Sequence, residues 1–389
     1  MQGIEHDYCN VCVRAVIMAW QALFNSPAVG LYNYTPYGKG DTLGLDAIPE
    51  IAIKTKLNEY DSHSILVTEE LDEVARQRLP NDSDPVKQPL MFFSDPTDRS
   101  KVLKEFIEEV SKGKPTEKIG KILKGINCAE TWEKKFEPPA IITGATSAIT
   151  GVRKSEVIFS VILNYITKTI FVATPKGIFY LDLPNFDNEL VESIDLNYIF
   201  KNGKQLNFLP AAEMCKSDDD AKRLVTFLGK EMYKYNFDDS KIFLEDSEQF
   251  LHHTNPGGPS RILYLSEIQK PYGPIGFILA NGEKIGEWIH WLAFAKFAKT
   301  VGTSGDENAL DVFEITVARP MYRDGVLMTP SPAYSIFREK DRKFYLDVSR
   351  LKHFQRPSTF RAMLVVTQRD NFTIECIMHQ HLHREISLK

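Results

Sequence analysis

The stretch GDTLGLDAIPEIAIKTKLNEYDSHSILVTEE, residues 40–70, and the later stretch PLMFFSDPTDRS, residues 89–100, decide the expected fold of this chain. Each contains a short apolar run, Ser64–Thr68 and Pro89–Phe93, that is typical of a buried strand. A polar segment with prolines, residues 79–89, separates the two runs. We therefore predict two buried strands, each of which runs directly into acidic residues.

Four carboxylates follow the two predicted strands: Glu69, Glu70, Asp95 and Asp98. A carboxylate at the end of a buried strand is costly unless it binds a cation or accepts hydrogen bonds. Pro96 fixes a turn, so Asp95 and Asp98 can present their oxygens to one point, with the Thr97 carbonyl between them. Hard oxygen ligands at this density suit Mg²⁺ or Mn²⁺.

Two neighbouring features favour phosphate at the same place. A helix is expected to begin at Arg99-Ser100, and its free N–H groups would point toward a bound phosphate. Asp46 lies upstream, at a plausible N-cap position before an amphipathic run over Ile48–Leu57. Separately, Glu-Glu after a strand is commonly a solvated loop, and Asp-Pro-x-Asp is commonly a turn. Their pairing after two buried strands favours a site for a divalent metal and phosphate.

The rest of the chain predicts a mixed α/β protein. Apolar residues at helical spacing cover the first thirty residues, and a Lys- and Glu-rich helical pattern covers 100–135. Residues 141–183 are typical of successive strands with turns between them. From about residue 210, short strands alternate with helical stretches such as 217–233, and the tail after residue 310 is β-rich.

Two domains are expected: residues 1–210 with the acidic motifs, and residues 211–389. A helical insertion is expected in the first, at about 101–140. The composition is 43% hydrophobic and 25% charged, which leaves enough apolar side chains for a large core and argues against a mainly disordered chain. The net charge of −5 shows no overall basic bias, so nucleic acid is not an expected partner.

Cysteine usage and apolar patterning favour a soluble cytoplasmic protein with no membrane partner. The five cysteines are odd in number and scattered, so we expect no disulfide framework and a reducing compartment. Cys9 and Cys12 have CxxC spacing but no second pair to complete a zinc site, and we expect two ordinary cysteines. His290, in an aromatic helical pattern, is expected to be packed and hydrogen-bonded. The N-terminus lacks the basic and apolar regions of a signal peptide.

Residues 35–100 resemble the superfamily of fructose-1,6-bisphosphatases and inositol monophosphatases, the lithium-sensitive, metal-dependent sugar phosphatases. That family has an Asp ahead of a helix, then a strand that ends in Glu-Glu, then a strand that ends in Asp-Pro-x-Asp-Gly-(Ser/Thr). The resemblance is weaker over 141–183 and faint over 257–302. It implies an α/β (α+β) fold, a layered α/β/α/β/α sandwich, to which the helical insertion and the β-rich C-terminal tail are added.

The resemblance also implies roles for individual residues. The implied metal ligands are Glu69, Asp95, the Thr97 carbonyl, Asp98 and Glu287. Asp46 and the Ser100 hydroxyl would orient and deprotonate the attacking water, and Glu70 would support the metal or the water from beside the ligands. The implied substrate and phosphate contacts are Asp41, Arg99, Ser100, Tyr272 and Lys284. The implied cofactors are two or three Mg²⁺ or Mn²⁺ ions.

Three departures from the family pattern bear on substrate and activity. Arg99 stands where the family has Gly, so that it either adds a bidentate phosphate contact or obstructs the substrate. About forty residues between Ser100 and Ile141 are typical of a charged helical insertion beside the mouth of the site. In the stretch that leads to Glu287, the last of the implied metal ligands, Lys284 is the only nearby cation.

The implied activity is that of a Mg²⁺-dependent phosphomonoesterase. Its substrate would be a small phosphorylated sugar or polyol, similar to fructose 1,6-bisphosphate or to an inositol phosphate, hydrolysed by direct attack of metal-activated water. A homodimer or homotetramer is expected by analogy. The alternative is a catalytically weak or inactive relative that binds a phosphorylated metabolite or a protein partner. Arg99 and the departure from the family pattern before Glu287 motivate this alternative. Residues 101–135 would then form the interaction surface.

Overall fold

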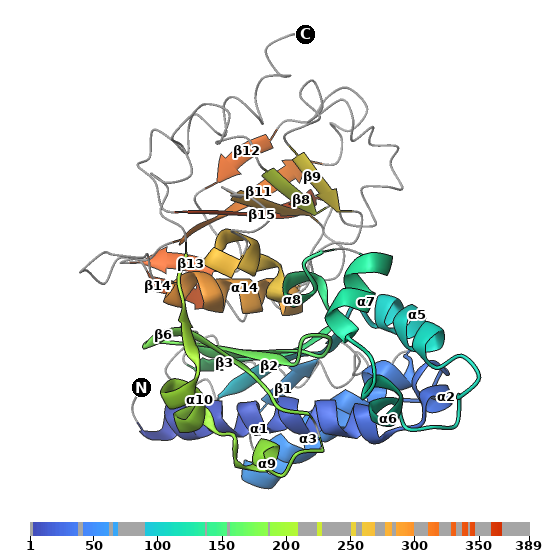
Figure 1. The fold of residues 1–389 in the computed structure, drawn as a ribbon. Coiled ribbons are helices and arrows are strands. Elements are labelled where there is room, and N and C mark those ends of the chain that lie inside the picture. Colours follow the sequence, from blue (N-terminus) through green and yellow to red (C-terminus); the bar gives the residue numbers. More distant parts are fainter. Residues whose placement is uncertain are drawn as a thin grey trace. The chain divides into compact units, whose positions relative to one another are not determined.

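A computed structural model gives the fold of the chain, which divides into two compact units (Figure 1). Unit 1 comprises Met1–Gln205, Gly258–Arg261 and Ile289–Phe294, and unit 2 comprises Leu206–Gly257, Ile262–Trp288 and Ala295–Lys389. The residues that the structure describes are 3–37, 42–61, 65–68, 90–136, 138–153, 156–185, 187–208, 224–227, 250–253, 259–268, 277–281, 285–298, 310–318, 328–331, 337–340, 343–346 and 359–367.

The sheet of unit 1 runs in the order β1-β2-β3-β4-β5-β6-β7. Its strands are β1 (Ile65–Thr68), β2 (Met91–Asp98), β3 (Thr146–Arg153), β4 (Glu156–Asn164), β5 (Thr169–Thr174), β6 (Gly177–Asp182) and β7 (Lys204–Leu206). The first two strands are parallel, and each pair from β2 to β6 is antiparallel. Both strands expected before the acidic residues are confirmed, but only β2 is buried along its length, whereas Ile65, Leu66 and Val67 of β1 are half-buried. The second is longer than expected, because it continues through the acidic residues to Asp98.

Two long helices lie side by side against this sheet (Figure 1). The helices of unit 1 are α1 (Gly3–Asn25), α2 (Ala28–Leu31), α3 (Gly44–Tyr60), α5 (Ser100–Val110), α6 (Ile119–Leu123), α7 (Cys128–Lys135), α8 (Ala140–Thr143), α9 (Leu190–Ser193) and α10 (Leu196–Asn202). Helix α1 packs on β3 and β4, and α3 packs on β2. The helical character expected of residues 101–140 is confirmed by α5 to α8.

Helix α1 is buried on most sides along its central part, from Val11 to Trp20. Cys9, Cys12, Val16, Trp20 and Leu23 recur at helical spacing and are essentially inaccessible to solvent. Burying an aliphatic side chain of this size contributes roughly 1.5–3 kcal/mol. Burial also raises the pKa of both thiols. The prediction of two ordinary cysteines is therefore confirmed, since both belong to the core.

The middle of helix α14 (Ile285–Phe297) belongs to unit 1 and contacts the other face of the sheet. Ile149 on β3 faces the α1 core, so its neighbour Thr150 points to the opposite face. There, His290 Nδ1 lies 2.7 Å from the Thr150 hydroxyl, which donates to Ser160 at 2.8 Å. Burial lowers the pKa of His290 to about 3. The expectation of a packed, hydrogen-bonded His290 is confirmed.

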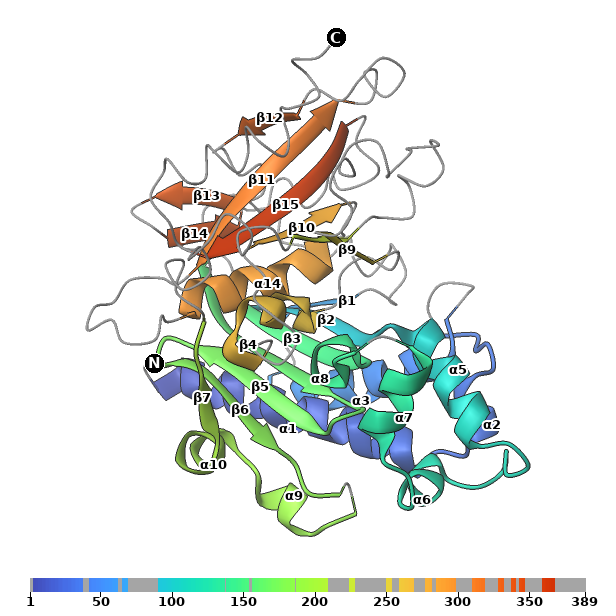
Figure 2. The same ribbon diagram turned by 45° about the horizontal axis from the view of Figure 1, so that its top comes forward.

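Unit 2 contains a six-stranded sheet in the order β12-β11-β15-β10-β8-β9, and Figure 2 shows its long β11–β15 pair. Its strands are β8 (Leu224–Phe227), β9 (Phe250–His253), β10 (Phe277–Asn281), β11 (Leu310–Ala318), β12 (Met328–Ser331) and β15 (Thr359–Thr367). A hairpin, β13 (Phe337–Lys340) and β14 (Lys343–Leu346), and a 3-10 helix at Pro259–Leu265 are also present. The mixed α/β class and the β-rich tail are confirmed.

The helix expected over 217–233 is wrong for its described part, because residues 224–227 form β8. Leu224–Phe227 contains β-branched and aromatic residues, and the strand pairs in parallel with both β10 and β9. Pairing with distant strands therefore overrides the helical pattern of the surrounding sequence. None of the helices that the structure describes has the length and the apolar run needed to cross a membrane.

Candidate metal and phosphate site

The acidic motif lies on a bulge of β2. Asp95 pairs with Ala148 and Asp98 pairs with Thr146 on β3, so two residues of β2 face the single residue Ser147. One of the two is Pro96, which has no N–H to donate and therefore interrupts the ladder. Bulges re-aim side chains at such positions. The two carboxylates of the motif thus flank one local irregularity inside β2, where the sequence predicts a turn after the strand.

Three hydroxyl groups surround the Pro96 carbonyl inside the bulge. The Thr97 hydroxyl lies 2.7 Å from it, the Tyr165 hydroxyl lies 3.3 Å from it, and Ser147 donates a short hydrogen bond to it. Tyr165 and Ser147 also contact each other through their hydroxyls. A buried carbonyl held in this way cannot turn without losing hydrogen bonds. The hydroxyl groups around the Pro96 carbonyl therefore hold the backbone between Asp95 and Asp98 in place.

A proline in α3 joins this helix to the acidic motif. Pro49 cannot donate to Leu45, the residue four positions earlier, so the Leu45 carbonyl lacks its usual partner within the helix. The Thr97 hydroxyl lies 2.6 Å from the Leu45 carbonyl oxygen and takes that place. The first turn of α3, which contains Asp46, is thereby held against the bulge of β2.

Asp46 occupies a different position from the one expected. Leu43 is the N-cap of α3, and Asp46 is the third residue after it, so the N-cap prediction is wrong. Its carboxylate accepts a hydrogen bond from the Leu43 N–H at 3.1 Å and is 6% exposed. The side chain therefore reaches back over the helix start, which is favourable beside the positive end of the helix dipole.

The hydroxyl of Tyr165 lies within the electrostatic reach of both Asp46 and Asp95. Burial raises the pKa of its hydroxyl, hydrogen bonds with Ser147 and Thr97 oppose the rise, and the negative charges of Asp95 and Asp46 add to it. Asp95 is 4% exposed, so both acids are buried near the same hydroxyl. A buried carboxylate is costly unless it accepts hydrogen bonds or binds a cation.

Glu50 is a buried carboxylate of the same helix that the sequence reasoning missed. It lies one turn after Asp46 and is fully inaccessible to solvent. The Tyr37 hydroxyl donates to one of its oxygens at 2.9 Å, and the Thr68 hydroxyl donates to the other at 2.7 Å. Thr68 ends β1 and directly precedes Glu69. The spacing of four residues from Asp46 was the available signal, since it places both acids on one face of α3.

Arg99 adopts the left-handed backbone conformation, with φ 61°, at the position where the resembling family has Gly. Its guanidinium lies 5.7 Å from the centre of the Trp132 ring and donates to the Thr143 carbonyl. Trp132 in turn donates to the Thr143 hydroxyl at 3.2 Å. This places the Arg99 side chain against α7 and α8. Ser100, the next residue, begins α5 beside Asp98.

The other predicted site residues are only partly covered by the structure. Asp41, Glu69, Glu70, Tyr272 and Lys284 lie outside the described residues. Glu287 lies in the backbone of α14, and its side chain is not described. Thr68, which precedes Glu69, pairs with Ser94, which precedes Asp95. Within the described part of the chain, no three acidic, histidine or cysteine side chains gather closely enough to hold a metal.

The donor chemistry of the described residues nevertheless fits a hard divalent cation. Asp46, Asp95 and Asp98 offer carboxylate oxygens, and Thr97 offers a carbonyl on the bulge between two of them. Mg²⁺ and Mn²⁺ prefer such ligands, and Mg²⁺ commonly uses one or two carboxylates together with water and substrate phosphate. The N-terminus of α5, with eleven residues, begins next to the same acids and favours an anion there.

In comparisons with known proteins, the chain is similar to several solved structures. The chain matches no protein-family description and no curated protein. It is similar to CysQ from Bacteroides thetaiotaomicron, a bacterial member of the inositol monophosphatase family, at 14% identity and a TM-score of 0.48, over 94% of this chain and 98% of that one. It is also similar to Staphylococcal IMPase-II, at 8% identity and a TM-score of 0.46, over 99% and 98% of the two chains.

A third similar structure is the inositol monophosphatase from Anabaena, at 9% identity and a TM-score of 0.44, over 79% of this chain and 83% of that one. Because their identities are so low, the function of the site is argued below from its own residues.

Proposed function

We propose that the chain is a phosphomonoesterase that depends on Mg²⁺ or Mn²⁺ and hydrolyses a small phosphorylated sugar or polyol. The observation that carries the proposal is the gathering of the buried carboxylates Asp46 and Asp95 at the bulge of β2, next to the start of α5. Buried acids beside a helix N-terminus suit a cation that is shared with a phosphate group.

The proposed ligands of the cations are Asp95, Asp98, the Thr97 carbonyl, Glu69 and Glu287. Two or three bound cations would neutralise phosphate oxygens and lower the pKa of the attacking water. Asp46, with one oxygen engaged by the Leu43 N–H, would orient that water and accept its proton. Ser100 would orient the water with its hydroxyl, and Glu70 would support this arrangement.

The proposed phosphate and sugar contacts come from both parts of the chain. The N-terminal N–H groups of α5 would bind phosphate oxygens. The remaining proposed contacts are Asp41, Arg99, Tyr272 and Lys284. For Arg99, a phosphate contact would have to draw the guanidinium from Trp132 or use its remaining N–H groups.

The test is release of inorganic phosphate from a panel of fructose 1,6-bisphosphate, inositol monophosphates and adenosine 3′,5′-bisphosphate, with and without Mg²⁺ or Mn²⁺. We expect metal-dependent turnover of one substrate, and its loss in Asp95→Asn. Glu130→Gln is the matched control, because this acid is exposed on α7 and pairs with Lys134 on the surface. Equal turnover in Asp95→Asn and wild type would contradict the proposal.

The contacts of Arg99 favour a second candidate, a phosphometabolite-binding protein with little turnover. Its side chain contacts Trp132 and Thr143, as expected if Arg99, which stands where the family pattern has Gly, holds the helices of residues 101–140 in place. In that case no member of the panel is hydrolysed, while the folded protein still binds a phosphorylated compound in the presence of metal. The same panel, followed by equilibrium binding, separates the two candidates.

A further inference from the structure

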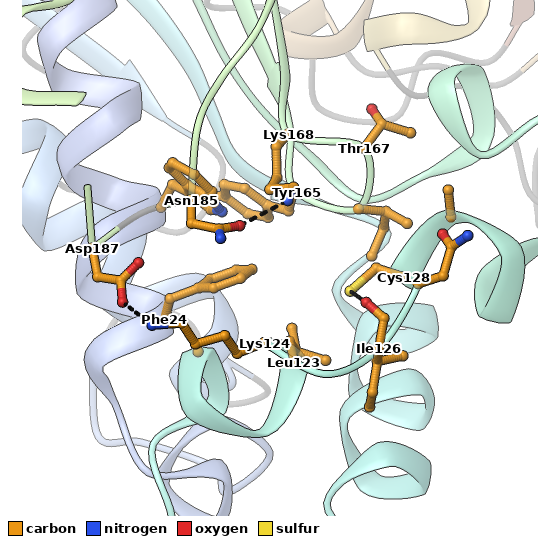
Figure 3. A pocket seen from close by; sticks show the side chains of 15 residues that line it. Phe24, Leu123, Lys124, Ile126, Cys128, Tyr165, Thr167, Lys168, Asn185 and Asp187 are labelled. Atoms are coloured by element: carbon orange, nitrogen blue, oxygen red, sulfur yellow. Dashed lines mark hydrogen bonds and ion pairs between the residues drawn. The ribbon is translucent and has the colours of Figure 1, made fainter. Parts of the chain in front are cut away.

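A cavity of about 290 Å³ lies in unit 1, apart from the residues of the candidate site (Figure 3). It is bounded by the end of α1, the connection from α6 to α7, the turn between β4 and β5, and the residues Asn185 and Asp187. None of the predicted ligands or substrate contacts lines it. Cavities that bind small molecules typically have volumes of about 300–1,000 Å³. This one therefore has room for a small molecule such as a single substituted ring.

One part of the lining is apolar and aromatic. Its side chains include Trp20, Phe24, Leu123, Ile126, Tyr165 and Ile166. Trp20 and Phe24 pack with their ring centres 5.4 Å apart, so this wall is fixed within the core of α1. A planar apolar ring would replace water against such a wall, which is favourable in proportion to the area buried.

The other part of the lining is cationic. Lys124 Nζ lies 2.8 Å from Asp187, and Lys168 Nζ lies 2.9 Å from the amide oxygen of Asn185, and Figure 3 shows both contacts at the edge of the cavity. These three are the charged residues of the lining, so one positive charge is in excess. The Lys168 ammonium also opposes the rise that burial causes in the pKa of Cys128.

Tyr165 connects the cavity to the acidic motif. Its side chain lines the cavity, while its hydroxyl lies 3.3 Å from the Pro96 carbonyl and contacts Ser147. Pro96 stands between Asp95 and Thr97. A ligand that shifts the Tyr165 ring would therefore move a group that holds the bulge of β2 in place.

We propose that this cavity binds a small organic monoanion with one aromatic ring, its negative charge at Lys168 and its ring against Phe24 and Ile126, and that Tyr165 transmits its binding to the bulge of β2. The binding step is independent of the proposed phosphatase activity. The transmission step rests on the proposed function, since it acts on the proposed metal ligands.

The probes are benzoate and its neutral isostere benzamide, each titrated by saturation-transfer NMR. Ligands of this size bind with dissociation constants on the order of millimolar. We expect benzoate to bind at least about tenfold more tightly than benzamide, since only benzoate meets the excess positive charge. Lys168→Gln should abolish this preference. Lys176→Gln is the matched control, because Lys176 lies over the Phe200 ring, away from the cavity, and it should keep the preference.

A second measurement locates the site without a variant. Cys128 lines the cavity, whereas Cys9 and Cys12 are fully buried. Benzoate should slow the alkylation of Cys128 by iodoacetamide several-fold more than benzamide does, as followed by peptide mass spectrometry. Equal binding of both probes, no protection of Cys128, or unchanged preference in Lys168→Gln would overturn the binding site.

Transmission is tested by Mn²⁺ affinity with and without benzoate. We expect a shift in wild type and none in Tyr165→Phe, which keeps the ring in the cavity and removes the hydroxyl. A protein that binds benzoate but no Mn²⁺ would refute the proposed function and the transmission together, and leave the binding site standing. A Mn²⁺ affinity that is unaffected by benzoate in wild type would refute the transmission alone.

Discussion

Unit 1 holds carboxylates in two contrasting environments, one at the junction of α3 with β2 and one on the helices of residues 101–135. At the junction, Asp46, Glu50 and Asp95 are each at most 6% exposed, and the donors that reach the first two are an N–H group and two hydroxyls. On the helices, Glu109 is exposed and lies within 3.1 Å of both Lys112 and Lys135.

The difference separates charges that water solvates from charges that depend on a partner inside the protein, either a hydrogen-bond donor or a bound cation. Exposed ion pairs cost little to form and contribute little, so they are typical of a solvated surface. Buried carboxylates are costly, and proteins keep them where they bind something.

The largest effect is expected for Asp46→Asn, because it removes the proposed proton acceptor and leaves the fold intact. We expect the turnover number with the best substrate of the phosphate-release panel to fall about 10²–10⁴-fold, the typical contribution of a general base. Steady-state kinetics measures it. The exposed Glu130→Gln should change turnover less than twofold. Similar losses in both variants would mean that the buried and exposed acids do not differ in function.

The next effect concerns Glu50, whose role is to hold the Tyr37 loop and the end of β1 on α3. Glu50→Ala leaves two hydroxyl donors without their acceptor and opens a space in the core. We expect the free energy of unfolding to fall by about 2–4 kcal/mol. Chemical denaturation followed by circular dichroism measures this loss. Glu109→Ala, on the surface, should leave the midpoint unchanged, and an equal shift in both variants would count against the distinction.

His290 is a buried base, and its stability effect depends on pH. Its pKa is lowered to about 3 by burial, whereas an unfolded histidine titrates near 6.5. The unfolded chain therefore binds a proton first as the pH falls, and stability is lost from about pH 6.5 downward. The loss reaches about 1.4 kcal/mol per pH unit, or about 2 kcal/mol at pH 5.

Unfolding measured from pH 7 to pH 5 in wild type and in His290→Gln tests this expectation. The variant removes the titrating group and keeps a polar side chain beside Thr150. Its stability should depend less steeply on pH than that of wild type. Parallel curves for the two proteins would show that His290 is already solvated in the folded state.

The smallest effect is expected at Arg99, where backbone strain and side-chain contacts oppose each other. With φ 61°, glycine is favoured over alanine, so Arg99→Gly should be more stable than Arg99→Ala by about 1 kcal/mol. Both lose the contacts with Trp132 and Thr143, so their difference isolates the backbone term. Thermal unfolding of the two variants measures it, and equal midpoints would argue against the left-handed conformation.

Local patterns predicted much of unit 1. The apolar runs before Glu69 and Asp95 identified both strands, because a short continuous apolar run next to a turn signal needs no distant partner to be recognised. The proline of the acidic motif likewise indicated that Asp95 and Asp98 flank a turn. The structure places this turn inside β2, as a bulge.

Contacts between distant residues could not be predicted. The hydrogen bond from Thr97 to the Leu45 carbonyl depends on Pro49, and the position of Tyr165 depends on the pairing of β4 with β3. The resemblance implies a phosphate contact for Arg99. Its contact with Trp132 cannot be deduced from the sequence, because that tryptophan lies on α7, which is distant along the chain. The same reason explains the strand β8 in the helical pattern of unit 2.

The most direct test of the central claim is a titration with Mn²⁺ followed by electron paramagnetic resonance, in wild type, Asp95→Asn and Glu109→Gln. We expect wild type and Glu109→Gln to bind Mn²⁺ with equal affinity, and Asp95→Asn to bind it at least about tenfold more weakly, since a carboxylate ligand is lost. Equal Mn²⁺ binding by all three proteins, or none by folded wild type, would contradict the claim that the buried acids at the bulge of β2 form a metal site.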